Sequence, residues 1–388
     1  MPVGQKEVWD TMAGSEKQYR VFISAAEPSA DAHCAGLITA MGKMRGDVEF
    51  VGVGGPRMAE AGCELLETTV GRASMIYNAF AHVLHYYELL RRIRRYLQEN
   101  RVDLVVVCDS PALNFHVARA AKKAGIRTVF YVAPQLWAWA AWRIAKLRRC
   151  CDKLCCILPF EQEWFAGRGL DTVFVGHPLL NDACPEPKAY EDFQARCVRV
   201  ALMPGSRTAE IKSLWQPMQE IAERIREKFP DASFVAVAVD EAGRRKLQAA
   251  QIAGFECEYS LGAVSETARQ ADFAIVASGS ATLQVAAAAC PMVIMYQSSP
   301  VLWHLVGRWL VKTKYLSLVN ILAGRELAPE FMPYFRSVEP IAKKCVELIE
   351  YKDSLKKMSG ELVELVKPLR PANASQTTVE IVGEMLGG

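Results

Sequence analysis

The first twenty residues contain no apolar run long enough for the central part of a secretory signal peptide. On that ground we expect the protein to remain in the cytosol. The chain also carries little excess charge, because 46 Lys and Arg residues against 43 Asp and Glu residues leave a formal net charge of +3. With no basic arm in the sequence, this balance argues against a nucleic-acid partner.

The 12 cysteines do not follow the Cys-x2-Cys spacing of a zinc site. The densest group overlaps the apolar run 154–158, where cysteine behaves as a small core residue (Cys150, Cys151, Cys155 and Cys156). The sequence also has no Asp-x-Asp pair that would hold a metal ion against a diphosphate. We therefore expect neither a metal nor a cofactor.

Charged residues are absent from 273–307, a stretch that hydropathy alone would flag as a membrane span. Gly279, Pro291 and Pro300 divide it into segments that are too short to cross a bilayer. We interpret the stretch as interior strands and a helix.

Apolar runs rich in β-formers alternate with helical stretches along the chain. The predicted strands are 20–25, 49–53, 104–108, 128–132, 154–158, 172–175, 198–202, 234–239, 273–276 and 292–296. This alternation predicts α/β domains with parallel sheets covered on both faces. A chain of 388 residues exceeds the usual size of a single core, and 178–196, with its prolines and charges, is the natural linker. Ligands of such sheets bind beyond the carboxyl ends of the strands, which predicts a site in a cleft between two domains.

A dinucleotide-dependent dehydrogenase is the first competitor for a chain of this pattern. The glycine-rich turn near the start reads Gly52-Val53-Gly54-Gly55-Pro56-Arg57, which puts an arginine where a dinucleotide-binding turn needs its third glycine. This departure disfavours a dehydrogenase.

Two strand-to-helix turns in the second half have the composition of phosphate sites. In the first, Gly205 lets the backbone approach a ligand, Ser206 follows, and Arg207 supplies a bidentate donor beside the positive end of a helix dipole. The alternative is an arginine that only ties down its loop. The second turn contains Ser278, Gly279, Ser280 and Thr282, and two such turns in one half of the chain indicate a nucleotide site.

Two carboxylates in the first half stand directly after predicted strands. Asp109 follows 104–108, where it would accept a proton from a hydroxyl group in a half-dry cleft. The alternative is that Asp-Ser-Pro caps the next helix. Glu27 occupies the equivalent place after the first strand, and Asp31, four residues on, is better suited to a structural cap.

The stretch 75–97 predicts a helix with an apolar and cationic outer face. On a helical wheel, four apolar residues share a sector with four arginines that follow one to two turns later (Phe80, Val83, Leu84 and Tyr87, then Arg91, Arg92, Arg94 and Arg95). Such a face suits contact with an anionic bilayer and capture of a phosphorylated lipid. A dimer contact or a plain solvated helix is the alternative.

A series of motifs, taken in order, resembles the lipid A disaccharide synthase family from about Tyr19 to the C-terminal helix. They read Glu27-Pro28-Ser29-Ala30-Asp31, Gly52-Val53-Gly54-Gly55-Pro56-Arg57-Met58, Pro134-Gln135-Leu136-Trp137-Ala138-Trp139, Leu158-Pro159-Phe160-Glu161, Phe174-Val175-Gly176-His177-Pro178, Pro204-Gly205-Ser206-Arg207, Ser278-Gly279-Ser280-Ala281-Thr282 and Val319-Asn320-Ile321-Leu322-Ala323-Gly324-Arg325-Glu326. The resemblance implies the GT-B fold, in which two doubly wound Rossmann-like domains face each other across a cleft and C-terminal helices follow. It implies an acceptor and membrane-facing domain over 1–180, a UDP-sugar-binding domain over 197–370, and a helix in 371–388 that packs back on the first domain.

The resemblance also assigns roles to particular residues. Asp109, with Glu27, would be the catalytic pair, while Arg207 and Ser206 would bind the diphosphate. The loop of Ser278, Gly279, Ser280 and Thr282 would receive the phosphates and uridine, and the family usually has Glu where this chain has Gln284, a side chain facing the ribose. Asn320 and Arg325 would face the same cleft, although Arg325 would equally suit a surface pair with Glu326 or Glu330.

The implied activity is that of an inverting glycosyltransferase. The 6-hydroxyl of 2,3-diacylglucosamine 1-phosphate would attack UDP-2,3-diacylglucosamine, giving a β-1,6 disaccharide 1-phosphate and UDP, at the inner face of the cytoplasmic membrane. Two alternatives stay open. One is another GT-B enzyme on UDP-sugars, such as a lipid-linked sugar transferase or an epimerase, and the other is a non-catalytic protein that binds nucleotide sugars or lipids. A homodimer also stays open.

Overall fold

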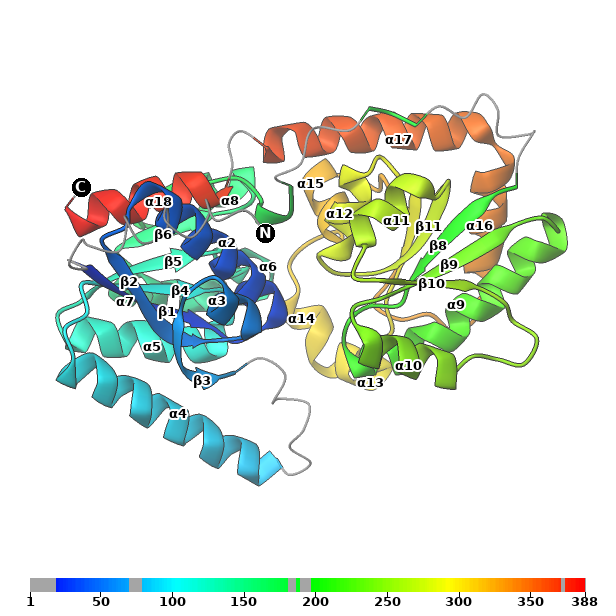
Figure 1. Cartoon of the computed structure of the whole chain (residues 1–388). Coiled ribbons are helices and arrows are strands. Elements are labelled where there is room, and N and C mark those ends of the chain that lie inside the picture. The colour runs from blue at the N-terminus through cyan, green and yellow to red at the C-terminus, as the bar shows by residue number, and fades with distance from the viewer. Residues whose placement is uncertain (1–18, 70–78, 181–185, 189–196, 371–373, 388) are drawn as a thin grey trace, which may run out of the picture. The chain divides into compact units, whose positions relative to one another are not determined.

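The computed structural model describes residues 19–69, 79–180, 186–188, 197–370 and 374–387, with the backbone alone for 79–84, 302 and 306. The chain divides into two compact units (Figure 1). Unit 1 comprises Met1–Asn181 and Pro371–Gly388, and unit 2 comprises Asp182–Arg370.

Unit 1 is built on a seven-stranded parallel sheet with the order β3-β2-β1-β4-β5-β6-β7. The strands are β1 (Tyr19–Ala25), β2 (Val48–Gly54), β3 (Glu64–Thr68), β4 (Leu104–Cys108), β5 (Arg127–Tyr131), β6 (Lys153–Cys156) and β7 (Thr172–Phe174). β1 and β4 lie next to each other, with Ala25 opposite Cys108, so the turns after these two strands start side by side. Every residue of β4 is buried, which explains its uninterrupted apolar sequence.

Helices cover both faces of this sheet (Figure 1). They are α2 (Pro28–Met44), α3 (Pro56–Glu60), α4 (Ala79–Glu99), α5 (Pro111–Lys123), α6 (Leu136–Trp139), α7 (Ile144–Cys150), α8 (Pro159–Ala166) and the last helix of the chain, α18 (Ala374–Leu386). α4 packs on α5 along one face, and α18 packs against α2 and β5 on the other. The end of the chain therefore belongs to the core of unit 1.

Unit 2 has a six-stranded parallel sheet with the order β10-β9-β8-β11-β12-β13. The strands are β8 (Arg199–Met203), β9 (Ser233–Ala238), β10 (Glu258–Leu261), β11 (Phe273–Ala277), β12 (Met292–Met295) and β13 (Glu330–Phe331). The helices are α9 (Thr208–Lys228), α10 (Glu241–Ala249), α11 (Val264–Gln270), α12 (Ala281–Ala287), α13 (Pro300–Leu302), α14 (Arg308–Leu310), α15 (Leu318–Ala323), α16 (Glu339–Glu350) and α17 (Lys352–Val366). The adjacent strands β8 and β11 bring the turns after them together.

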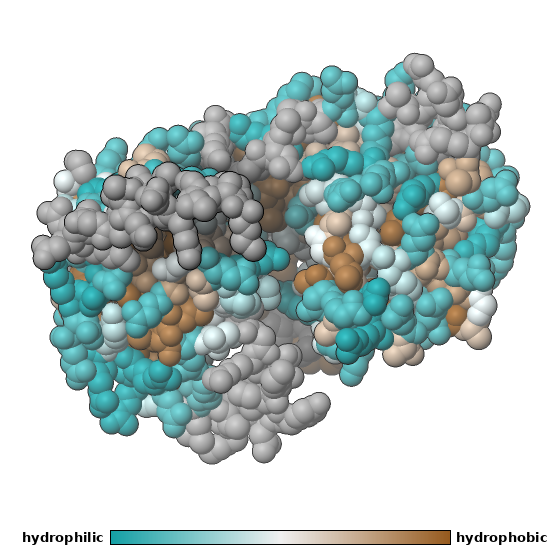
Figure 2. Space-filling model, viewed as in Figure 1, coloured by the Kyte–Doolittle hydropathy of each residue, from teal (hydrophilic) through white to brown (hydrophobic). Residues whose placement is uncertain are grey.

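The part of the charge-free stretch up to the end of β12 lies in the interior as expected, since β11 and β12 are fully buried and only α12 lies between them. The expectation was wrong for its last part, where Val301 and Leu305 are exposed. None of the helices among the described residues is both long and apolar enough to cross a bilayer. On the face shown in Figure 2, apolar residues gather in patches on each unit within a mostly hydrophilic surface.

Candidate active site

The turn after β4 in unit 1 holds Asp109 in an unusual backbone conformation. Asp109 and Ser110 both have positive φ, at 48° and 43°, which costs a residue with a side chain roughly 1–2 kcal/mol. Asn114 on α5 stabilises this turn, because its Nδ2 donates to the carbonyls of Cys108 at 2.8 Å and Asp109 at 2.7 Å. Its Oδ1 accepts from the Ser24 hydroxyl on β1 at 2.7 Å, so the turn is fastened to two strands. Two adjacent strained residues held by a buried network are typical of a functional site.

The helix-cap alternative for Asp109 does not describe this turn. Ser110, not Asp109, occupies the N-cap position of α5, and its side chain makes no capping bond. The Ser110 hydroxyl is buried, and within the described residues its oxygen has no hydrogen-bond partner. Asp109 itself is only half-buried. A polar ligand at this turn would therefore meet a carboxylate and an unsatisfied hydroxyl together.

The two carboxylates after β1 have different environments. Glu27 is half-buried at the N-cap position of α2, where its side chain makes no capping bond. Asp31 is 2 % exposed, and its carboxylate accepts the backbone N–H groups of Gly55 at 2.9 Å, Arg57 at 3.2 Å and Met58 at 3.1 Å. Asp31 therefore caps the neighbouring helix α3, a structural role, while Glu27 lies near the ends of β1 and β4.

Sequence reasoning gave no role to Glu161, a buried carboxyl close enough to Asp109 to feel its charge. Glu161 Oε1 accepts from Trp137 Nε1 at 2.9 Å, and Oε2 accepts from the backbone N–H groups of Ile157 and Leu158, each at 3.1 Å. Burial raises the pKa of this carboxyl to about 7, and the charge of Asp109 adds to the shift. The only sequence signal for this role was the position of Glu161 three residues after Leu158, the N-cap residue of α8, which is the spacing of a capping box.

Two histidines of unit 1 are held neutral. Burial lowers the pKa of His33 on α2 to about 4. Burial, with the charge of His33 as a smaller cause, lowers the pKa of His177 to about 3. The Nδ1 atom of His177 accepts the backbone N–H of Leu179 at 3.3 Å, which fits the structural role expected for this loop residue.

In unit 2, the backbone donors of the turn after β8 are occupied by the carboxylate of Glu210. Gly205 has φ of 96°, and the next two backbone N–H groups, of Ser206 and Arg207, donate to Glu210 Oε2 at 3.0 and 3.1 Å. The Arg207 guanidinium lies 3.3 Å from Glu210 Oε1, with its side chain 68 % exposed. These backbone donors are satisfied within the chain by Glu210, while the Arg207 guanidinium is exposed beside the same carboxylate.

The turn after β11 lies next to that of β8. Gly279 and Ser280 are exposed, Ser278 is half-buried, and the buried Thr282 hydroxyl donates to the Gly279 carbonyl at 2.7 Å. A Cβ at Gly279 would meet no atom within 4 Å, so open space lies over this turn. Gln284, one turn into α12, is half-buried.

Asn320 is not a ligand-facing residue, which corrects the expectation from the family. It is fully buried, and its Nδ2 donates to the Ala328 carbonyl at 2.7 Å and to Glu330 at 2.9 Å. Its Oδ1 accepts the backbone N–H groups of Leu327 at 2.8 Å and Ala328 at 3.0 Å. With all these bonds made within unit 2, the amide has no capacity left for a substrate and instead holds the loop between α15 and β13.

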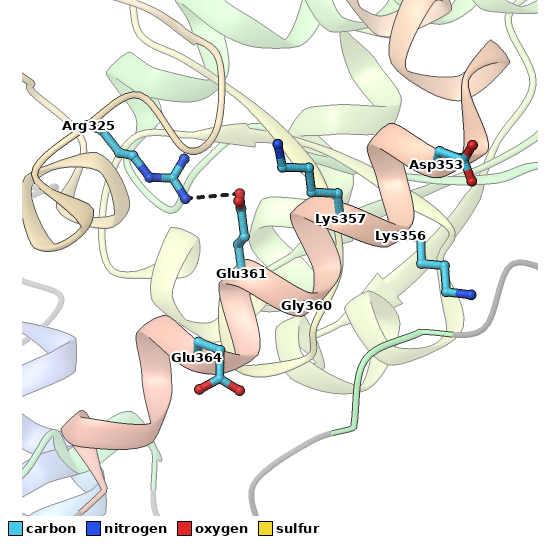
Figure 3. Close-up of a pocket in the computed structure, with 7 residues that line it drawn as sticks. All are labelled: Arg325, Asp353, Lys356, Lys357, Gly360, Glu361 and Glu364. Atoms are coloured by element: carbon cyan, nitrogen blue, oxygen red, sulfur yellow. Dashed lines mark ion pairs between the residues drawn. The ribbon is translucent and has the colours of Figure 1, made fainter.

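Arg325 pairs with Glu361 of α17 at 3.0 Å, and not with Glu326 or Glu330 (Figure 3). The pair lines an open hollow of about 540 Å³ along α17 whose other side chains carry charges of both signs (Asp353, Lys356, Lys357 and Glu364). A hollow of mixed charge shows no preference for an anion. This geometry gives Arg325 a surface ion pair, which is worth little to stability.

The expected pattern of α4 is present where its side chains are described. Leu89, Leu90, Ile93 and Leu97 are buried, and Tyr87 on the opposite face is 66 % exposed. Phe80, Val83 and Leu84 lie outside the described side chains.

The four arginines of α4 are exposed, but they are not equivalent. Arg92 is held by Glu67 at 2.6 Å and by the Leu66 carbonyl at 2.8 Å, which reduces its availability to a lipid phosphate. Arg95 lies 3.8 Å from Glu99, a loose pair, and Arg91 and Arg94 complete the cationic face. Among the described residues, no group of three or more His, Cys, Asp or Glu side chains is placed to hold a metal ion.

Two α/β units, each with a parallel sheet, form the GT-B fold, which the chain shares with solved glycosyltransferases and epimerases. It matches the "S. aureus MnaA-UDP co-structure" with a TM-score of 0.63 at 11% identity, covering 95% of this chain and 97% of the other. It matches MurG of Acinetobacter baumannii with a TM-score of 0.59 at 14% identity, over 94% and 99% of the two chains. At such identities the likeness confirms the predicted fold alone.

Sequence comparison places the chain more narrowly. The model of the lipid-A-disaccharide synthetase family matches residues 21–381. Lipid-A-disaccharide synthase of Anaeromyxobacter sp. (strain K) is 34% identical over 376 residues, which cover 94% of this chain and 97% of that protein. The protein of the same name from Geobacter sulfurreducens is 31% identical, with 95% and 98% covered. The chain belongs to the lipid-A-disaccharide synthase family, and the predicted enzyme class, a glycosyltransferase of lipid A synthesis, is confirmed.

Proposed function

We propose that the chain transfers the sugar of UDP-2,3-diacylglucosamine to the 6-hydroxyl of 2,3-diacylglucosamine 1-phosphate, with Asp109 as the general base. The family membership supports the substrate pair. The observation that supports the base is the turn after β4, where a half-buried carboxylate stands on a strained backbone fixed by Asn114. Such fixing keeps a base in place while the hydroxyl attacks.

In this reaction the acceptor oxygen attacks the anomeric carbon as the bond to the UDP oxygen breaks. Asp109 takes the hydroxyl proton, and Glu27, on the neighbouring strand end, binds an acceptor hydroxyl or assists. The negative charge that develops on the leaving diphosphate is stabilised by Arg207 and by the open turn at Gly279. Gln284 supplies one amide oxygen to the ribose hydroxyls. No step requires a metal ion.

Membrane contact is part of the same proposal. Both sugars carry acyl chains, so an enzyme that uses them works at a lipid surface. We assign unit 1 to the acceptor and unit 2 to UDP binding, with α4 contacting the inner face of the cytoplasmic membrane peripherally through Tyr87 and its arginines.

The test is incubation of the purified chain with both lipid substrates in detergent, with UDP and disaccharide measured separately. Asp109→Asn is expected to lower turnover by about 10²-fold or more while leaving UDP affinity nearly unchanged. Asp231→Asn, which alters an exposed carboxylate after α9, is the matched control.

The reaction products distinguish the alternatives. Near-normal turnover in Asp109→Asn would remove that residue from the base role. An epimerase would convert UDP-sugar without acceptor, and a non-catalytic protein would bind UDP without releasing product. Loss of activity in EDTA that added Mg²⁺ restores would contradict the metal-free scheme.

A further inference from the structure

A helical segment of unit 2 that the proposed reaction does not use presents apolar side chains to solvent. It runs from α13 through a π-helical turn, Trp303–Gly307, to α14. Val301 is 65 % exposed, Leu305 68 %, Trp309 70 % and Leu310 41 %. The first three are spaced four residues apart, which puts them on one face of the helix. Isolated exposed apolar residues are common, but a stripe of this size marks an interaction surface.

The exposure of this stripe is fixed by contacts on the other side of the segment. His304 Nε2 lies 2.9 Å from the Tyr334 hydroxyl. Trp303 packs so closely over Gly307 that a Cβ there would lie 2.5 Å from the indole ring. Trp303 is therefore half-buried against its own segment, while Trp309 is exposed.

The chain on either side of the segment is also tied to unit 2. Before it, the Ser298 N–H donates to the Pro333 carbonyl at 2.9 Å. After it, Glu330 accepts from the Ser317 N–H at 3.1 Å and from the Ser317 hydroxyl at 2.6 Å. The stripe is thus a fixed face of a packed segment.

The charged residues within the segment and along the chain on either side of it are all basic. Arg308, Lys312 and Lys314 are the charged residues of 273–324, and all three are exposed. Within the described part of the chain, none of the three forms an ion pair with a carboxylate. The Arg308 guanidinium lies 4.8 Å from the centre of the Trp309 ring, so cation and aromatic group are presented together.

We propose that the segment 300–314 docks unit 2 onto an anionic lipid bilayer, with Leu305 and Trp309 inserted at the headgroup level. Tryptophan favours this depth because its ring is apolar and its N–H is polar. Arg308 and Lys314 would meet lipid phosphates at the same surface. A second copy of the chain would bring the same cationic face and be repelled, whereas a bilayer supplies both the apolar layer and the negative charge. The inference depends neither on α4 nor on any catalytic residue.

The experiment measures binding of the full chain to vesicles of phosphatidylethanolamine and phosphatidylglycerol, without sugar substrates. Leu305→Ser with Trp309→Ser is expected to lower the partition coefficient at least about tenfold, because two apolar side chains no longer leave water. The matched control is Leu261→Ser with Tyr351→Ser, which removes apolar residues that are 46 % and 61 % exposed elsewhere in unit 2. This control should bind as the unchanged chain does.

A second pair of variants tests the charge. Arg308→Gln with Lys314→Gln is expected to weaken binding to these vesicles severalfold and to leave binding to pure phosphatidylcholine unchanged. Its control is Lys228→Gln with Arg245→Gln, where both side chains are exposed. Brominated lipid should quench the fluorescence of the unchanged chain more than that of Trp309→Phe.

Binding that is equal in the Leu305→Ser, Trp309→Ser variant and its control would overturn the proposal. So would a change in oligomeric state by sedimentation velocity without a change in vesicle binding, because the stripe would then contact a second copy. The readout needs no UDP-sugar, so either failure leaves the proposed transfer reaction untouched.

Discussion

Replacing Asn114 by alanine tests whether the strained turn at Asp109 is held as described. The change removes two donors to carbonyl oxygens and one acceptor for the Ser24 hydroxyl. At about 1 kcal/mol for each lost hydrogen bond, with a similar amount for the cavity left by a fully buried side chain, unit 1 should lose about 3–4 kcal/mol. Ser24→Ala, the matched control, breaks only one of these bonds and should cost about 1 kcal/mol.

Hydrogen exchange of the β4 amides, followed by mass spectrometry, reads this loss locally. A loss of 3–4 kcal/mol corresponds to exchange that is faster by at least about 10²-fold, since 1.4 kcal/mol is a factor of ten. Because Asp109 would no longer be fixed, kcat should fall by about tenfold or more while KM for the UDP-sugar changes little. Exchange no faster than in Ser24→Ala, with an unchanged kcat, would refute the assignment of Asn114 as the residue that positions the base.

Three further predictions concern other groups. Gln284→Glu should tighten UDP binding by up to about tenfold, because a carboxylate accepts two charge-assisted hydrogen bonds, and Gln284→Ala should weaken it. Calorimetry with UDP measures both changes. Equal UDP affinities of the three proteins would mean that Gln284 does not contact the nucleotide. The raised pKa of Glu161, about 7, means that between pH 5 and pH 7 the folded state keeps a proton that the unfolded state has lost, so the free energy of unfolding should fall by about 2–3 kcal/mol from pH 5 to pH 8. Urea titrations should show this fall in the unchanged chain and not in Glu161→Gln. The same dependence of the free energy of unfolding on pH in both proteins would contradict the prediction. Replacing the arginines of α4 by Gln should release protein from anionic vesicles beyond the release caused by salt (Arg91, Arg92, Arg94 and Arg95). Arg91 and Arg94 should contribute more than Arg92, because Glu67 already pairs with Arg92. Unchanged vesicle binding would mean that α4 has another role.

The interior of both sheets was predictable because buried parallel strands are almost continuously apolar. β4 and β11, for example, begin and end within a residue of the predicted runs. The sequence did not predict β3, β10 and β13, which lie at sheet edges, are short and contain exposed or half-buried polar residues. Edge strands lack the second buried face that makes an interior strand visible in sequence.

The site was predictable as far as local chemistry reaches. The position of Asp109 after a strand and the glycine at position 205 were visible in sequence, whereas the left-handed backbone at 109 and 110 depends on Asn114, which contacts a distant strand. For Asn320 the motif suggested a contact with the ligand, but the side chain is fully buried and bonded within unit 2. Burial of a single polar residue could not be predicted from the motif. The role of Glu210 could have been predicted, because a glutamate three residues after the N-cap residue, here Arg207, is the spacing of a capping box.

The return of α18 to unit 1 affects the order of events during synthesis. Thr378, Val379 and Val382 of this helix are buried, so the core of unit 1 is incomplete until the end of the chain has left the ribosome. Between the two parts of unit 1 lies Asp182–Arg370, about 190 residues that take roughly 10 to 40 s to translate at about 5–20 residues per second. During that time α2 exposes the surface that α18 will cover, and a nascent chain in this state is a natural client for a chaperone. A truncation that removes α18 would thus damage the domain that is made first.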